Sequence, residues 1–127
     1  MENKSYIWIT LQKVGFHKWS NAPDAVGFLS APHRHIFHFK IYIQLLHHND
    51  REIEFFMFKK DIEQMLKYIW IGLNLDEYKH CAGVSCEMIS DKLNKDIGLL
   101  YPNRNTIIEV SEDGENGSRK EYNNHNI

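Results

Sequence analysis

Hydrophobic and polar positions alternate along the first half of the chain, as they do in half-buried β-strands. The stretches "YIWITLQKV" at residues 6–14 and "HIFHFKIYIQLL" at residues 35–46 each place their odd-numbered apolar residues on one side. Between them, residues 17–32 contain two prolines and a glycine, which predicts a long loop. The stretch "HHNDREIEFFMF" predicts a turn at residues 48–51 and a third strand that forms a hairpin with the second.

The second half of the chain begins with a change of period. From Lys59 the apolar residues fall three or four positions apart, which predicts an amphipathic helix. Ser85 is expected to cap a second helix that ends before Pro102. Its inward positions are Cys86, Ile89, Leu93, Ile97 and Leu100.

Two further strands are expected near the C-terminus. "NTIIEVSE" at residues 105–112 predicts a fourth strand, "DGENG" a turn, and "SRKEY" at residues 118–122 a short fifth strand. We therefore expect one α+β domain over residues 1–122, in the order βββααβ(β), followed by a polar tail at residues 123–127.

Composition restricts the class of protein. The chain has 127 residues, of which 43% are hydrophobic, enough for one domain with a core. Its formal net charge of −2 and the lack of a basic block argue against a nucleic-acid-binding module. No apolar run approaches the roughly 20 residues that span a bilayer, and the first residues do not resemble a signal peptide. Two cysteines, Cys81 and Cys86, fit a reducing compartment, so we expect a cytoplasmic protein with no membrane partner.

Three histidines are candidates for a metal site. In "SAPHRHIFHF", His33 and His35 are two positions apart, so on a strand they point to the same face as the apolar row. His17 continues the odd-numbered row of the first strand, and pairing of the two strands would bring the three imidazoles together. Three neutral nitrogen donors with an open fourth position are typical of a catalytic zinc site. The alternative is that His33 and His35 are exposed loop residues and that His17 merely flanks Trp19.

A carboxylate is expected at the end of the apolar face of the fourth strand. Glu112 shares parity with Ile108 and Val110, and a buried carboxylate must find a partner. Because a carboxylate can accept two parallel N–H bonds, it suits the amidine-like edge of a guanine or a pterin. The alternative is that Glu112, Asp113 and Glu115 only solvate the hairpin turn.

Together these stretches resemble the 6-pyruvoyl-tetrahydropterin synthase and 6-carboxy-tetrahydropterin synthase family over nearly the whole chain. "VGFH", which ends at His17, is similar to the family's F-x-A-A-H, and "HRH" is similar to its H-G-H, with Arg34 in place of the glycine. "SCE" at residues 85–87 looks like the family's T-S-E motif, and "VSED" places Glu112 where its pterin-anchoring glutamate lies.

The resemblance implies a tunnelling fold (T-fold), in which an antiparallel sheet carries two helices on one face and chains assemble into homo-oligomers, either trimers or hexamers. It also implies a zinc-dependent carbon–oxygen lyase that acts on a pterin or purine-nucleotide derivative. The implied zinc ligands are His17, His33 and His35. The implied substrate-binding residues are Glu112, Ser85, Cys86 and Glu87.

The chain departs from the family pattern in its acid–base residues. Leu29 stands at the position of the family's proton-transferring cysteine. The family's Asp-His pair maps onto Asp76 and Glu77, which are then the implied catalytic residues, without the histidine. These departures leave a second function open, in which a catalytically inactive T-fold protein sequesters a nucleotide-derived ligand.

Overall fold

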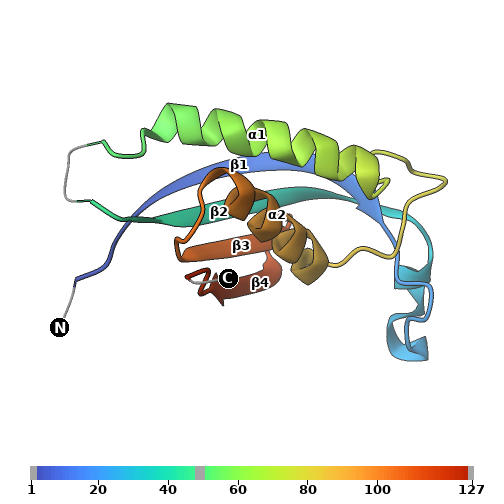
Figure 1. The fold of residues 1–127 in the computed structure, drawn as a ribbon. Helices are drawn as coiled ribbons and strands as arrows, with labels where there is room; N and C mark the ends of the chain where they lie inside the picture. Colours follow the sequence, from blue (N-terminus) through green and yellow to red (C-terminus); the bar gives the residue numbers. More distant parts are fainter. Residues whose placement is uncertain (1–2, 48–50, 126–127) are drawn as a thin grey trace.

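The computed structural model describes residues 3–47 and 51–125 and shows an α+β domain (Figure 1). Its elements in chain order are β1 (Ser5–His17), the short 3₁₀ segment η1 (Asp24–Ser30), β2 (His33–Leu45), α1 (Phe55–Gly72), α2 (Cys86–Leu100), β3 (Thr106–Glu112) and β4 (Asn116–Tyr122). The α+β class is confirmed.

The four strands form one antiparallel sheet in the order β1-β2-β3-β4. The β1–β2 register runs without interruption from Ser5 opposite Leu45 to His17 opposite His33. Phe37 of β2 lies opposite Glu112 of β3. Because side chains alternate along a strand, the odd positions of β1 and β2 share a face with the even positions of β3.

Both long helices pack on this face of the sheet. α1 contacts β1, α2 contacts β3 and β4, and the two helices contact each other. Between sheet and helices lies a single core of buried apolar side chains. Its largest fully buried members are Phe37, Phe39, Ile41, Ile43, Phe58, Ile62, Leu66, Ile69, Leu75, Ile89, Leu93 and Ile97.

The prediction of a third strand is wrong, because residues 51–58 contain no strand. Residues 51–54 form a turn and an extended residue, and α1 begins at Phe55 rather than at Lys59. Glu54 caps the helix, with its carboxylate accepting from the backbone N–H of Phe56 and Met57. The apolar run looked like a strand, but its first three side chains are exposed and only Phe58 is buried. Of the predicted turn, residues 48–50 lie outside the described residues.

The second helix agrees with its predicted bounds. The Ser85 hydroxyl caps α2 by accepting from the N–H of Met88, 3.2 Å away. The inward assignment of Leu100 is wrong, since this side chain is 54% exposed. Ser90 is buried instead and hydrogen-bonds to the hydroxyl of Tyr122 at 2.8 Å, which joins α2 to β4. No helix within residues 3–47 and 51–125 combines the length and the apolarity needed to cross a membrane.

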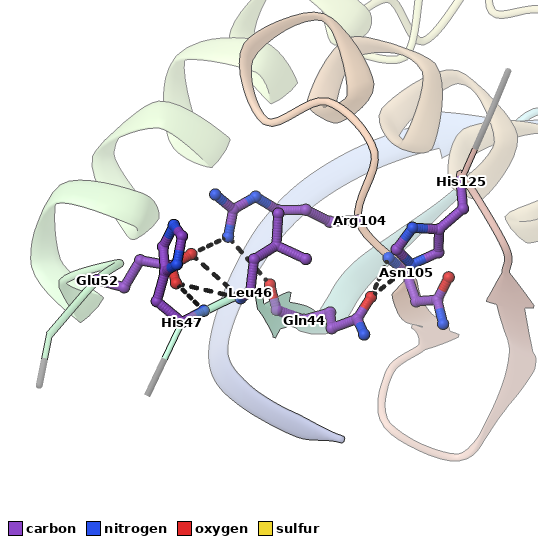
Figure 2. Close-up of polar contacts among 7 residues, drawn as sticks. All are labelled: Gln44, Leu46, His47, Glu52, Arg104, Asn105 and His125. Carbon is purple, nitrogen blue, oxygen red and sulfur yellow. Dashed lines mark hydrogen bonds and ion pairs between the residues drawn. The ribbon is translucent and has the colours of Figure 1, made fainter. Parts of the chain in front are cut away.

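A polar cluster closes the end of the sheet that lies opposite His17 (Figure 2). Arg104, in the α2–β3 loop, donates from Nη1 to the Glu52 carboxylate and to the Gln44 carbonyl. Glu52 also accepts from the backbone N–H of Leu46 and of His47. The side chains of Glu52 and Arg104 are only 10% and 15% exposed. This cluster therefore ties the end of β2 and the start of α1 to the loop before β3.

The chain beyond β4 is held by side chains of other elements. The Gln44 amide oxygen lies 3.0 Å from the backbone N–H of Asn105 and 2.9 Å from Nε2 of His125 (Figure 2). Asn124 forms a reciprocal amide pair with Asn94 of α2. The described part of the predicted tail, residues 123–125, thus docks on the same end of the sheet.

Candidate metal centre

Three strands end at one place and bring four metal-ligating side chains together. His17 ends β1, His33 and His35 begin β2, and Glu112 ends β3. One donor atom from each of the four lies within 4.8 Å of all the others. The ring centroids of the three histidines are 4.6 to 5.1 Å apart. The predicted convergence of the histidines is confirmed, and Glu112 joins them.

Each imidazole is oriented through its Nδ1 atom. The three contacts are His17 to the Val84 carbonyl at 2.6 Å, His33 to the Ala31 carbonyl at 2.9 Å, and His35 to Oδ2 of Asp113 at 2.7 Å. Carbonyl and carboxylate oxygens only accept hydrogen bonds, so Nδ1 carries the proton in each ring. In the neutral imidazole, Nε2 then presents its lone pair, which is the form that binds a metal ion.

The Nε2 atoms of His17 and His35 are both turned toward the Glu112 carboxylate. Among the residues that the structure describes, buried Nε2 atoms of His17 and His35 find no hydrogen-bond partner. Yet Oε2 of Glu112 lies 2.7 Å from Nε2 of His17 and 3.5 Å from Nε2 of His35. Lone pairs at these distances repel unless a cation stands between them. The residues present therefore fit a metal ion.

The charge state of His17 agrees with this arrangement. Burial lowers the pKa of His17 below 6.5 and outweighs the opposing effects of the Val84 hydrogen bond and the Glu112 charge. The neighbouring His33 and His35 lower the pKa of His17 further. His17 is therefore neutral near pH 7 and keeps the lone pair that a metal ion needs.

The core supports the rings from behind. Phe37 packs edge-on against His17 and His35, at centroid distances of 5.4 and 5.9 Å. Gly15 leaves room for this contact, because a Cβ atom there would lie 3.0 Å from the Phe37 ring and 3.1 Å from the Trp70 ring. The ligand positions are thus set by close packing as well as by hydrogen bonds.

A cavity of about 480 Å³ opens beside the cluster. It brings together several predicted site residues, namely His17, His33, Glu112, Ser85, Cys86 and Glu87. Trp19 and Leu29 from the β1–β2 connection also line it. Metal donors and the start of α2 therefore face one space, as expected for a binding site.

The predicted acid–base residues lie differently. Asp76 and Glu77 are exposed and do not line this cavity of the single chain. Leu29, at the position of the family's cysteine, does line it. Burial, together with the charges of Glu112 and then Glu87, raises the pKa of the Cys86 thiol to about 12, so that thiol stays protonated at neutral pH.

Two features of the centre were not predicted from the sequence. The sequence predicts that Glu112 holds a ligand ring or solvates the turn, not that it faces the imidazoles, and it predicts only a turn position for Asp113. The alternation along β3 predicts which face of the sheet Glu112 is on. Its distance from His17 depends on the registers among β1, β2 and β3. The Asp-Gly pair in "EDGENG" was the one available signal for Asp113, since it predicts a tight hairpin beside the end of β3.

Comparisons of the sequence with family models and curated proteins do not identify this centre. No family model matches the chain, and no curated protein matches it. The resemblance to the tetrahydropterin synthase family remains a prediction from the motifs.

Proposed function

We propose that the chain binds zinc through Nε2 of His17, His33 and His35, with Oε2 of Glu112 as a fourth donor. The observation that carries this proposal is the convergence of one donor atom from each of the four residues, while all three Nδ1 atoms are held by oxygen acceptors. Imidazole nitrogens and carboxylate oxygens are both zinc donors, and zinc usually takes four of them. Zinc bound there would act as a Lewis acid toward an oxygen of a bound ligand where that oxygen joins or replaces the Glu112 donor.

We further propose that the adjacent cavity binds a pterin or purine-nucleotide derivative. Its volume is in the usual range for small-molecule sites. Trp19, which is 51% exposed, offers an aromatic face on which a planar ring can stack. With Oε2 of Glu112 turned toward the imidazoles, Oε1 is available to accept an N–H from the ring.

We also propose that the fold is a T-fold and that the chain forms homo-oligomers, as the resemblance implies. Within the described residues, β1 and β4 are each paired on one side only. β1 is 13 residues long, and an unpaired strand of that length is a ready template for pairing with another chain.

The activity that the resemblance implies is a zinc-dependent carbon–oxygen lyase. A second candidate, a protein that sequesters its ligand without turnover, is favoured by the cavity lining. Leu29 cannot transfer protons, and the thiol of Cys86 has a pKa of about 12. Loss of a positioned acid–base group costs roughly 10²-fold to 10⁴-fold in rate.

The zinc proposal is tested by the metal content of the purified protein. We expect one zinc per chain in the wild type and none in His33→Ala, which removes one imidazole donor. His80→Ala is the matched control, because this histidine is exposed in the loop before α2. Equal zinc content in the wild type and His33→Ala would refute the assignment.

The ligand proposal is tested with zinc-loaded protein and a dihydroneopterin triphosphate type of substrate. Zinc-dependent product formation would support the lyase, whereas tight stoichiometric binding without product would support the sequestering protein. If calorimetry detects no binding of this substrate or of a purine nucleotide, the proposed ligand class is wrong.

A further inference from the structure

The turn that follows Glu112 has a defined geometry. The N–H of Glu115 donates to the carbonyl of Glu112 at 3.0 Å, which closes a tight turn between β3 and β4. Asp113 and Gly114, the two central residues, have φ angles of 58° and 70°. Positive φ at both central positions is the type I′ hairpin turn, for which Asp-Gly is a preferred pair.

Asp113 fastens this turn to the first residues of β2. Its backbone N–H donates to the Ile36 carbonyl at 2.7 Å. Its side chain accepts from the N–H of Ile36 at Oδ1, 2.8 Å away, and from Nδ1 of His35 at Oδ2, 2.7 Å away. Each carboxylate oxygen thus accepts a different hydrogen bond, Oδ1 from the backbone and Oδ2 from the imidazole.

We propose that Asp113 is a positioning residue that holds His35 in the Nδ1–H tautomer and so directs Nε2 toward the metal ion. This inference rests on the proposed metal centre. His17 and His33 are held by main-chain carbonyls, which a substitution does not remove. His35 depends on a side chain. Carboxylates that accept the second ring N–H of a metal-binding histidine typically change metal affinity by 10-fold to 100-fold when they are replaced.

Asp113→Asn makes the proposal testable with little change of shape. Asparagine tolerates the positive φ that the turn requires. Its single oxygen can continue to accept from the N–H of Ile36, which leaves the NH₂ group facing Nδ1 of His35. An NH₂ group donates, so Nδ1 must then accept, and the proton moves to Nε2. That tautomer places a hydrogen where the metal ion would bind.

The tautomer is measured first, in metal-free protein. Long-range ¹H–¹⁵N NMR correlations above pH 8 distinguish the two tautomers of each ring. We expect Nδ1–H for all three histidines in the wild type and Nε2–H for His35 alone in Asp113→Asn. An unchanged His35 tautomer in this variant would overturn the proposal.

Metal affinity is measured second, by competition between the protein and a chromophoric chelator for Zn²⁺. We expect the affinity of Asp113→Asn to fall 10-fold to 100-fold. Glu115→Gln is the matched control, since it removes the same charge from an exposed position in the same turn and is expected to leave the affinity within about twofold. Equal affinities of Asp113→Asn and Glu115→Gln would contradict the proposal.

The proposal can still be tested if Asp113→Asn does not fold or if the wild type does not bind Zn²⁺. If Asp113→Asn does not fold, Asp113→Gly keeps a residue suited to positive φ, and the proposal then requires a mixture of His35 tautomers and weaker Zn²⁺ binding. If the wild type does not bind Zn²⁺, the proposed function fails. The tautomer experiment still tests the role of Asp113, because it uses no metal.

Discussion

Glu112 belongs to the candidate metal centre and also lines the cavity beside it. Its Oε2 faces two imidazole Nε2 atoms, and its side chain also lines the space beside them. Oε2 of Glu112 lies 2.7 Å from Nε2 of His17, close enough for both atoms to bind one ion. In the proposed function, Glu112 therefore contacts both the metal ion and the ligand.

Replacement of Glu112 by alanine separates these roles. We expect Glu112→Ala to weaken zinc binding at least 10-fold, because the variant loses a charged donor, and to abolish binding of the ring. Zinc affinity and ligand affinity are both measured by calorimetry. A variant that keeps the wild-type zinc affinity and loses only the ligand would show that Glu112 is an anchor alone.

The alternation of side chains along the strands predicts part of the site. Alternation along two strands placed His17, His33 and His35 on the face where the structure has them. The Val84 carbonyl and the Asp113 carboxylate, which fix the ring tautomers, come from distant segments. The position of Val84 follows from tertiary packing. The Asp-Gly pair predicts the turn that contains Asp113, but the contact of Asp113 with His35 depends on how β3 lies beside β2.

At the scale of elements, the start of α1 shows why a local pattern can mislead. "FFMF" has the composition of a strand, and Glu54 is not among the preferred N-cap residues. The helix forms because Phe58, Ile62 and Leu66 share one helical face that the core buries. Tertiary burial decided the element, and the exposed Phe56 shows that hydrophobicity alone did not.

The close packing at Gly15, where β1 meets α1, predicts an effect of substitution on stability. We expect Gly15→Ala to lower the free energy of unfolding by about 1–3 kcal/mol, because the added methyl group overpacks Phe37 and Trp70. Gly98→Ala is the control, since a Cβ atom there meets nothing within 4 Å, and we expect it to stabilise α2 by roughly 0.5–1 kcal/mol. Urea unfolding measures both. Equal stabilities of the two variants would contradict the packing at Gly15.

The ion pair between Glu52, in the connection before α1, and Arg104, in the α2–β3 loop, predicts a pH dependence. Burial would raise the pKa of Glu52, but hydrogen bonds from Arg104, Leu46 and His47 outweigh it and lower the pKa below 4.5. A lowered carboxyl pKa stabilises the fold above pH 4.5, and this stability is lost as the pH falls through the folded-state pKa.

Glu52→Gln tests this dependence. We expect it to reduce the free energy of unfolding by about 1.5–3 kcal/mol at pH 7, with a smaller difference from the wild type at pH 3. Glu63→Gln, an exposed change on α1, is the control for loss of charge. A difference between Glu52→Gln and the wild type that does not change with pH would show that the ion pair does not set the pKa.

Among the residues that the structure describes, the outer edges of β1 and β4 are unpaired and one face of the sheet lies outside the core. Trp8 on β1 is 52% exposed on that open face. The proposed T-fold assembly would pair these edges between chains. We expect light scattering to give the mass of a trimer or a hexamer at micromolar concentration, and the mass of a monomer would contradict the proposed assembly.

The metal centre is tested most directly by native mass spectrometry of protein purified without a chelator. One spectrum reports the number of chains and the mass of any bound ion. We expect an oligomer that carries one zinc ion per chain, with the zinc lost in His33→Ala. A metal-free wild-type protein that also fails to take up added zinc would contradict the metal centre at His17, His33, His35 and Glu112.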